Sequence, residues 1–489
     1  MRFVLLIICV VLVDALRLAM AADPQFELRV VDQDSNEPIA VRMHVFDRRQ
    51  QPVTVAETLN QDGFFTIDGA HIFRLKPGEY TFRMERGPEY KIRTGNFSIQ
   101  KAAEDNQQVT MERFAHLSHD GWYSGDLDSY LADEDIGRWM LAEDLHFAVT
   151  TAKENQKADT SDSQAVAKQR FFSSQAVNIS VGRRQQIRLL RTTAALEGKV
   201  GPDSVFEHLK RIYRSHPDAK PIVYLGRSFA ANRAAADDRS HTHPDLPVWL
   251  ASGQLKMFPV LDQSFTHQAN WHVDDLLAAR ETYFKILEAG CRIPPVAGSG
   301  AGISGNPLGY NRVYVYCGEE FTADRWWSQL LLGRCFITNG PILTVKANDQ
   351  LPGTVFPGYQ GETVTLELSA NLATREKISY LQVIKNGQNV AEVRLDDWAK
   401  AGGRLPPIEF TESGWCLLMA QTENADTPHL AMSGPFYVEF DNQVRVSPDA
   451  IRWLHHAAQL RLKQLQQQGD SPASLRYHQA AVRKFAEEP

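Results

Sequence analysis

Cysteine, positive charge and long apolar runs are all scarce in this sequence. Five cysteines occur in 489 residues and none stands in a CxxC pair, so the spacing indicates no dense disulfide framework. Lysine and arginine total 52 against 59 aspartates and glutamates, and this balance provides no basic excess for binding nucleic acid. No serine stands in a G-x-S-x-G turn and no cysteine in a known nucleophile motif, which argues against serine and cysteine hydrolases.

The one long apolar run, Phe3–Val13, predicts an export signal. Arg2 provides a positive charge before it, and the small residues Ala19 and Ala21 fit a cleavage site. Because the run is shorter than the roughly 20 residues that span a bilayer, we expect no membrane span in the mature chain. We expect that chain to begin near Ala22 in a periplasmic or extracellular space. Four cysteines then remain, and the sequence leaves open whether they are bridged or are small buried side chains: Cys291, Cys317, Cys335 and Cys416.

The pattern of apolar residues changes twice along the mature chain. Short alternating runs such as "VRMHVFD" and "GEYTFRME" predict a β-sandwich similar to transthyretin-like or carboxypeptidase-regulatory-like modules. Strands that alternate with helices follow, and then β runs return, with Asn386–Gly387 placed as a hairpin turn. The predicted order is a signal peptide (1–21), a first β-sandwich (22–113), an α/β domain (114–341), a second β-sandwich (342–441) and a helical tail (442–489).

The α/β prediction depends on the middle of the chain. "HFAVTTA", "PIVYLG", "KMFPVLD" and "RVYVYC" are typical of buried strands, and helices are predicted to end near Gly290 and Gly333. This alternation predicts parallel α/β layering. Residues 153–192 are polar and give no clear assignment, while Trp326 and Trp327 are predicted to lie in the core.

The stretch "GWYSGDLDSY" contains the first candidate metal ligands. Asp126 ends a short β-prone run, and Asp128 can also ligate a metal that keeps one position open for water. Tyr130 is a poor substitute for histidine at the next alternate position. The alternative interpretation is that these acids only cap and order a loop.

Histidines elsewhere extend this candidate set. His146 begins a predicted strand, and His241 and His243 form an H-x-H pattern beside acidic residues. His267 follows a predicted strand, a position that suits a site built at strand C-termini. Each histidine also has a structural interpretation, as a core-facing side chain or as part of a polar surface loop.

Three motifs resemble segments of a known family. "GWYSGDL", "WWSQLLLGRCFITNGPILTV" and "RGPEY" are similar to segments of the CehA/McbA-type, carbaryl-hydrolase-like metallohydrolases of the polymerase-and-histidinol-phosphatase (PHP) superfamily. The resemblance implies a multidomain protein in which a PHP-like distorted (β/α) barrel is flanked by two β-sandwiches, with a helical tail. It also implies divalent metals and hydrolysis of esters, amides or carbamates by metal-bound hydroxide.

Most of the family's ligand positions are changed in this sequence. The family pattern SGDLHxH puts its two histidines at Asp128 and Tyr130, and its later GSDAH pattern puts an aspartate and a histidine at Gly300 and Gly302. Asp126 is the one clear retained position. The resemblance therefore predicts a degenerate metal site.

Three hypotheses remain. The first is an exported, non-catalytic binding or scaffold homologue without a cofactor, with glycan or other cell-surface material as a possible class of partner. The second is an active hydrolase with a rearranged site that binds Zn, Mn or Fe. The third is a purely structural envelope protein whose sandwiches provide the function. The rearranged site would use the candidate residues Asp126, Asp128, His146, His241, His243 and His267.

Overall fold

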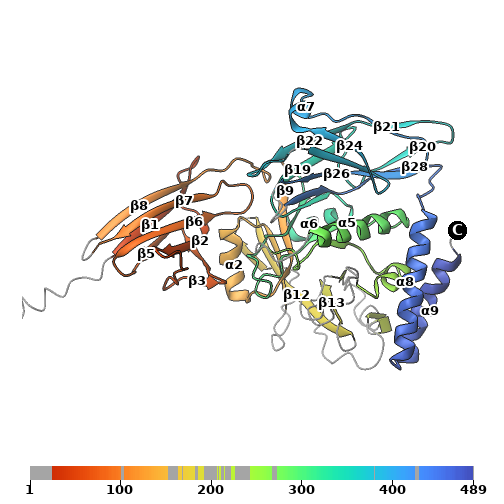
Figure 1. The fold of residues 1–489 in the computed structure, drawn as a ribbon, viewed down its shortest axis with the longest axis horizontal. Helices are drawn as coiled ribbons and strands as arrows, with labels where there is room; N and C mark the ends of the chain where they lie inside the picture. Colours follow the sequence, from red (N-terminus) through yellow and green to blue (C-terminus); the bar gives the residue numbers. More distant parts are fainter. Residues whose placement is uncertain are drawn as a thin grey trace, which may run out of the picture. The chain divides into compact units, whose positions relative to one another are not determined.

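The chain is multidomain and β-rich, with several separate sheets (Figure 1). The computed structural model describes residues 25–100, 104–151, 164–167, 169–181, 185–191, 206–207, 209–210, 214, 222–225, 243–266, 273–378, 380–423 and 429–487. The predicted signal peptide lies outside these residues. The chain divides into two compact units, of which the first comprises the chain up to Arg86, Tyr90–Arg113 and Leu141–Glu143.

The first unit is built on one eight-stranded sheet in the order β7-β6-β2-β4-β5-β1-β8, with β3 beside β4. In β6, Tyr80, Phe82 and Met84 alternate with exposed residues and face the core. The rings of Phe26 in β1 and Phe97 in β7 stack 4.7 Å apart although other strands separate them in the sheet order, so the sheet folds over its own core. Its strands are β1 (Gln25–Asp32), β2 (Ala40–Asp47), β3 (Leu59–Gln61), β4 (Phe64–Asp68), β5 (Ala70–Phe73), β6 (Gly78–Glu85), β7 (Arg93–Ile99) and β8 (Glu104–Met111).

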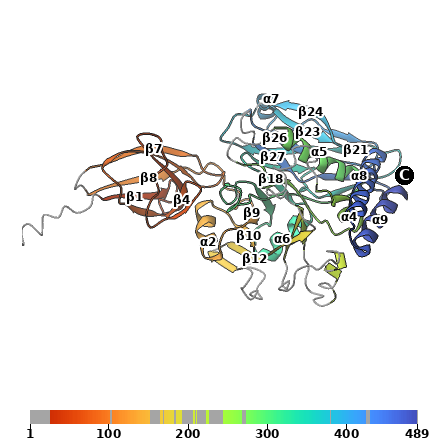
Figure 2. The same cartoon turned by 60° about the horizontal axis from the view of Figure 1, so that its bottom comes forward.

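A 14-stranded sheet organises the second unit, with the path β14-β13-β12-β10-β9-β17-β18-β27-β26-β23-β24. Its first half contains β9 (Trp122–Ser129), β10 (Phe147–Thr151), β11 (Gln164–Ala167), β12 (Arg170–Val181), β13 (Gln185–Leu190), β14 (Ile222–Tyr224), β17 (Arg312–Tyr316) and β18 (Cys335–Thr338). Figure 2 shows β9, β10 and β12 side by side.

Parallel layering was predicted for this region, and the prediction is correct for only part of it. The pairs β9–β10 and β10–β12 are parallel, as is the separate pair of β15 (Phe258–Leu261) and β16 (Pro295–Ala297). By contrast, β12–β13, β13–β14 and β9–β17 are antiparallel. Only residues 182–184 separate β12 from β13, and a parallel pair needs a connection of about a dozen residues or more.

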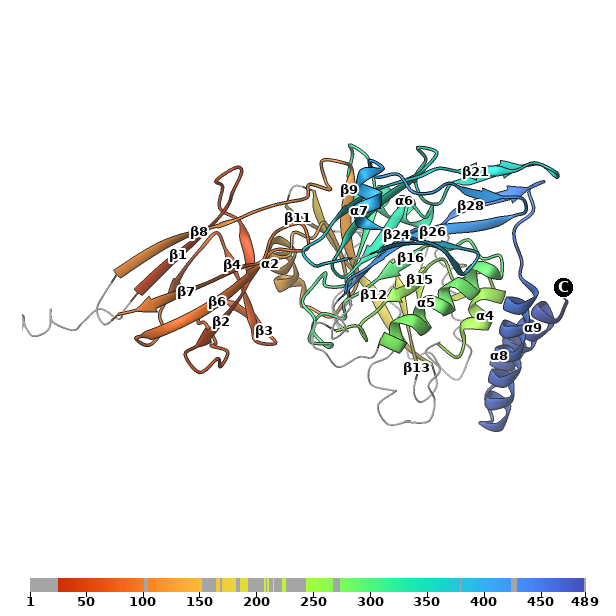
Figure 3. The same ribbon diagram turned by 45° about the horizontal axis from the view of Figure 1, so that its top comes forward.

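Two isolated bridges continue this succession of strands. Val223 of β14 pairs in parallel with Leu255, which precedes β15, and Ser129 of β9 pairs in parallel with Ala301, which follows β16. The pairings therefore lead from β9 through β10, β12, β13 and β14 to the β15–β16 region and back to β9. Figure 3 shows β15 and β16 beside α5 (Val273–Glu288), the helix that joins them in sequence.

Helix α6 (Ala323–Leu331) holds β9 in place. Thr322 caps it by accepting a hydrogen bond from the Arg325 N–H at 3.2 Å. Trp326 is fully buried, as predicted, and donates its indole N–H to the Tyr123 carbonyl at 3.0 Å. A Cβ at Gly125 would lie 2.3 Å from the Trp326 ring, so this strand position requires glycine. Two other helices of the unit are α2 (Asp133–Ala142) and α4 (Leu246–Ala251).

The second half of the large sheet belongs to the C-terminal β region. It is continuous with the first half because β18 pairs with β27, across the predicted division at residues 341 and 342. The predicted Asn386–Gly387 hairpin is confirmed: both residues have positive φ and they join the antiparallel strands β23 and β24. The described elements of the C-terminal β region are β19 (Ile342–Ala347), β20 (Val355–Gly358), β21 (Val364–Leu366), β22 (Leu368–Ala373), β23 (Tyr380–Lys385), β24 (Gln388–Arg394), α7 (Leu395–Lys400), β25 (Ile408–Phe410), β26 (Gly414–Gln421), β27 (Leu430–Ser433) and β28 (Phe436–Phe440). Of these, β19 pairs with β22 and β21 with β25 in separate two-stranded sheets.

The chain continues into two packed helices, α8 (Pro448–Gln467) and α9 (Pro472–Glu487) (Figure 3). Both pack against α4, and Arg461 of α8 forms a buried ion pair with Asp245, the residue before α4. Among the described residues, no helix is long and apolar enough to cross a membrane.

Candidate functional site

Strand β9 places two carboxylates inside the second unit. All eight of its residues are buried, and Asp126 and Asp128 are 0% and 2% exposed. Because alternate side chains of a strand point to the same face, the two carboxylates share one side of β9. Backbone N–H groups bind the Asp126 carboxylate, whereas an arginine pairs with the Asp128 carboxylate.

Backbone N–H groups bind both oxygens of Asp126. Its Oδ1 accepts hydrogen bonds from the N–H groups of Asp128 and Ser299, each at 3.0 Å, and its Oδ2 accepts from the N–H of Gly309 at 2.7 Å. Burial raises the pKa of Asp126, and these donors oppose the rise. The carboxylate thus ties β9 to the loop that follows β16.

An arginine neutralises Asp128. Arg188 of β13 donates from Nη1 to Asp128 Oδ1 at 2.6 Å, and from Nη2 to the carbonyls of Ser129 at 3.0 Å and Val149 at 3.3 Å. The guanidinium also lies over the Tyr130 ring, 4.9 Å from its centroid. Asp128, the position that the sequence resemblance assigns to a metal-binding histidine, therefore forms an internal salt bridge.

The surroundings of Asp128 are strongly acidic. Burial raises its pKa to about 6; Arg188 opposes this rise, whereas Asp126 and Asp262 increase it. Asp262 is itself 3% exposed, and its carboxylate accepts hydrogen bonds from the N–H and hydroxyl groups of Ser264. The charges of Asp126 and Asp262 thus act on the buried Asp128 carboxylate, and Arg188 opposes them.

Tyr224 of β14 adds a buried hydroxyl to this cluster. Within the described part of the chain, neither Tyr224 Oη nor Arg188 Nε has a hydrogen-bond partner. Burial, with the charges of Asp128 and Asp262, raises the pKa of Tyr224 well above its usual value, so the hydroxyl remains protonated. A Cβ at Gly298 would lie 2.4 Å from Asp128 Cβ and 2.7 Å from Tyr224 Oη, so the two side chains and the glycine backbone are close neighbours.

The glycines at the family's later ligand positions have structural roles here. Gly300 donates its N–H to the Asp128 carbonyl at 2.7 Å and has φ +65°. A Cβ there would lie 2.5 Å from Gln263 Cβ, and one at Gly302, with φ +96°, would lie 3.2 Å from the Tyr130 carbonyl carbon. Both positions therefore favour glycine for backbone conformation and for space.

His146 lies apart from this cluster. Its Nδ1 is 3.1 Å from the Ser124 hydroxyl, and its ring packs edge-on against Tyr123 at 5.1 Å and against Phe321 at 6.0 Å. Asp144, two residues earlier, pairs with Arg170. His146 thus belongs to an aromatic group near the start of β10.

His243 belongs to another group. Its Nδ1 accepts the N–H of Asp245 at 3.2 Å, and the Asp245 carboxylate accepts from Arg461 Nε at 2.6 Å. His478 of α9 lies 3.9 Å from the same carboxylate. Of the other two candidates, His241 and His267 lie outside the described residues. The structure therefore joins Asp126 with Asp128 but places His146 and His243 elsewhere.

The described residues do not fit the divalent metal that the family resemblance implies. The oxygens of Asp126 accept backbone hydrogen bonds, Asp128 is paired with Arg188, and Gly300 and Gly302 have no ligating side chain. Across the described part of the chain, no three His, Cys, Asp or Glu side chains converge as a metal site. A cation at Asp128 would have to displace the guanidinium or be repelled by it.

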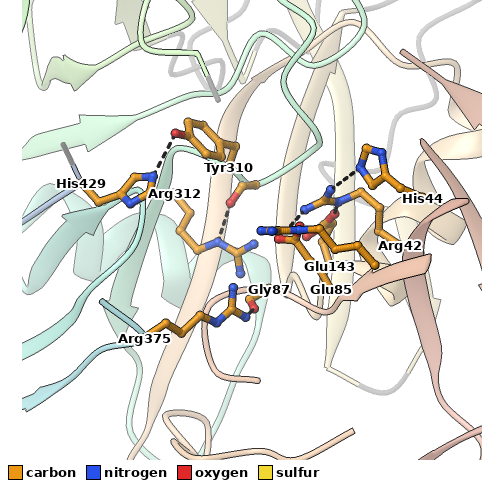
Figure 4. A network of polar contacts seen from close by, with 11 residues as sticks. Arg42, His44, Glu85, Gly87, Glu143, Tyr310, Arg312, Arg375 and His429 are labelled. Carbon is orange, nitrogen blue, oxygen red and sulfur yellow. Dashed lines mark hydrogen bonds and ion pairs between the residues drawn. The ribbon is translucent and has the colours of Figure 1, made fainter. Parts of the chain in front are cut away.

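The "TNGP" motif is held in place by a hydrogen bond and by close packing. In "TNGP", Asn339 accepts the Leu430 N–H at 2.7 Å, and a Cβ at Gly340 would lie 2.7 Å from His429 Cβ. His429 contacts Tyr310 Oη at 3.2 Å through Nε2, and Glu376 through Nδ1. Figure 4 shows the Tyr310–His429 contact and, within the first unit, the ion pairs of Arg42 with Glu85 and Glu143.

Sequence reasoning missed Arg188, Tyr224 and Ser299. Arg188 stands in "QQIRLL", between the buried residues Ile187 and Leu189. An arginine inside a short apolar β run was the available signal, since such a residue is seldom buried without a partner. Arg188 lies within the polar residues 153–192, for which the sequence gives no clear assignment.

Comparisons with known proteins give no family for this chain. No family model matches it, and no curated protein matches it. Three similar solved structures are the Bacillus anthracis TIE protein (20% identity, 22% of this chain and 19% of that one, TM-score 0.15), a streptococcal ancillary pilin (16%, 22% and 36%, 0.16) and apo Bacteroides uniformis beta-glucuronidase 3 (10%, 86% and 63%, 0.20). The chain thus spans less than two thirds of the length of each. At these TM-scores the similarities indicate neither fold nor function.

Proposed function

We propose that this protein is an exported PHP-like, CehA/McbA-type homologue that has lost its metal site and acts as a binding or scaffold module. The observation behind this proposal is the Arg188–Asp128 pair. A hydrolase of this class needs a metal that activates water, whereas this position holds a protein cation bound to the nearest carboxylate. A guanidinium has no open coordination position and cannot generate a metal-bound hydroxide.

The strand pairings support the barrel-like part of the proposal. A succession that runs from β9 to β14, on to the β15–β16 pair and back to β9 is compatible with a distorted barrel. Both oxygens of Asp126, the residue that the resemblance assigns to a retained ligand position, accept backbone N–H groups. Its role is then to hold the loop at Ser299 against β9.

Glycan or other cell-surface material is the class of partner that we propose. The C-terminal β region has two exposed tyrosines, Tyr359 and Tyr380, which are 66% and 42% exposed. Tyrosine combines a rigid apolar ring with a polar tip and is enriched at binding surfaces. We would substitute these two tyrosines first and measure how strongly the full chain binds isolated cell-envelope glycans. We expect weaker retention for Tyr359→Ser combined with Tyr380→Ser, and no change for the control Leu460→Ser on α8.

Metal content tests the loss of the site. The purified mature protein is exposed to Zn, Mn and Fe in separate samples, dialysed, and analysed by mass spectrometry. We expect no stoichiometric metal. Stoichiometric metal that disappears in Asp126→Ala combined with Asp128→Ala would overturn the proposal. It would support the rearranged hydrolase instead and justify a screen of ester, amide and carbamate substrates.

A further inference from the structure

The oxygen atoms around Arg188 resemble the coordination shell of a cation. The guanidinium contacts Asp128 Oδ1, the Ser129 carbonyl and the Val149 carbonyl, at 2.6, 3.0 and 3.3 Å. All three are oxygens, and they come from two neighbouring strands, β9 and β10. Oxygen-only shells are those that hard divalent cations such as Ca²⁺ and Mn²⁺ prefer.

A second, independent feature indicates a ligand position beside these oxygens. The hydroxyl of Tyr224 is fully buried and has no hydrogen-bond partner within the described residues. It interacts electrostatically with Asp128, Asp126 and Asp262. A buried hydroxyl without a partner is unfavourable, so such a group in a polar cluster indicates a place for another polar species.

The charges of the buried side chains around Arg188 also indicate a site for a cation. Asp126, Asp128 and Asp262 are all at most 3% exposed, and Arg188 is the cation that contacts Asp128. Without it, two backbone carbonyls and a carboxylate would face one another in a medium of low polarity. Buried oxygens arranged in this way attract a positive charge strongly because water does not screen the interaction.

We propose that this oxygen cluster is a cation site permanently filled by the protein's own Arg188, and that removing the guanidinium converts it into a site for a hard divalent cation. This inference rests on the proposed loss of the metal site and deepens it. Arg188 would then occupy the place of a cation at these oxygens, in addition to the loss of ligating side chains at Gly300 and Gly302.

The test compares four forms of the full chain. These are the natural protein, Arg188→Ala, Arg188→Lys and the double variant Arg188→Ala with Asp128→Asn. Thermal unfolding is followed with and without Ca²⁺ or Mn²⁺, and Tb³⁺ luminescence excited through tyrosine reports a cation close to Tyr130 and Tyr224. We expect Arg188→Ala alone to gain roughly tenfold or more in Ca²⁺ affinity, with a raised unfolding temperature when the cation is present.

Each result decides between the possibilities. Arg188→Ala that folds but gains no cation affinity, or that stays unfolded with cation present, would contradict the internal-cation proposal and leave the proposed function intact. A gain that persists in the double variant would place the new site elsewhere and also contradict it. Cation binding by the natural protein at Asp126 and Asp128 would instead contradict the proposed function.

Discussion

Two buried aspartate–arginine pairs of the second unit have the same length in different electrostatic surroundings. Asp128–Arg188 and Asp245–Arg461 both have an N–O distance of 2.6 Å, and both aspartates are at most 3% exposed. Burial raises the pKa of Asp128 to about 6, and neighbouring carboxylates add to this effect. Burial also opposes ionisation of Asp245, yet His243, Arg461 and His478 together lower its pKa.

The difference shows that an ion pair's length does not determine what it does for the fold. Asp245 joins α4 to α8 and α9 in a cluster where Arg461, His243 and His478 all favour its ionised form. Asp128 lies near two other carboxylates, and Arg188 opposes but does not cancel the combined effect of burial and of Asp126 and Asp262 on its pKa. The Asp245–Arg461 pair therefore connects helices, whereas the Asp128–Arg188 pair resembles a ligand site whose cation is supplied by the protein.

Removing the arginine of each pair should give the largest contrast. We expect Arg188→Met to lower the free energy of unfolding by about 3–5 kcal/mol, since it leaves Asp128 buried among other acids. Arg461→Met should cost only about 1–3 kcal/mol, because His478, whose Nε2 lies 3.9 Å from Asp245, can take up a proton beside the unpaired carboxylate. Urea unfolding measures both. Arg452→Met, at an exposed site on α8, is the control and should change stability by less than about 0.5 kcal/mol. Equal losses at the two buried sites would mean that the surroundings do not matter.

The two aspartates should contribute to stability with opposite dependence on pH, and replacing each by asparagine tests this. The pKa of Asp128 is raised from 3.8 to about 6, so the stability it contributes is present at low pH and is lost as pH rises through this interval. The pKa of Asp245 is lowered, so its contribution is present above 3.8 and is lost as pH falls below that value. Relative to the natural protein, Asp128→Asn should therefore gain stability as pH rises from about 4 to about 6. Asp245→Asn should show no such gain. Urea midpoints over this range provide the measurement, and parallel curves for the two variants would reject the comparison.

His478 should have a smaller effect in the same cluster. Burial lowers its pKa below 6.5, and Asp245 opposes this change. The unfolded chain then binds a proton more readily, so the natural protein loses stability as pH falls below 6.5. We expect His478→Gln to make this part of the stability profile flatter, whereas His456→Gln, at an exposed position, should leave it unchanged. A profile unaffected by His478→Gln would mean that this histidine is protonated equally in both states.

Local patterns predicted several elements correctly, because the information for them is close in sequence. The Asn386–Gly387 turn follows from the φ values that these residues tolerate, and the core position of Trp326 follows from helix periodicity. The strand before Asp126 was also predicted from its β-prone run, but it does not end at Asp126 as expected and continues to Ser129. The antiparallel pairing of β12 with β13 could have been inferred only if their short connection had been recognised.

The arrangement of the candidate site could not be predicted in this way. Arg188 reaches Asp128 across 60 residues of sequence, and Ser299 reaches Asp126 across 173. No spacing rule connects such partners. The histidine candidates also had suitable spacing, yet His146 and His243 lie in other groups because sequence alone does not indicate which strand ends meet.

Two buried tyrosines allow the finest test of the cluster around Asp128. Tyr314 donates its hydroxyl to Glu89 at 3.1 Å, whereas Tyr224 has no such partner in the described part of the chain. Tyr314→Phe should therefore cost about 1–3 kcal/mol by leaving a buried carboxylate short of a donor. Tyr224→Phe should be neutral or stabilise by up to about 1 kcal/mol, since it removes a hydroxyl that burial penalises. Urea unfolding of the two variants gives the comparison. A clear loss for Tyr224→Phe would mean that the hydroxyl has a hydrogen-bond partner in solution and that the place beside Arg188 is already filled.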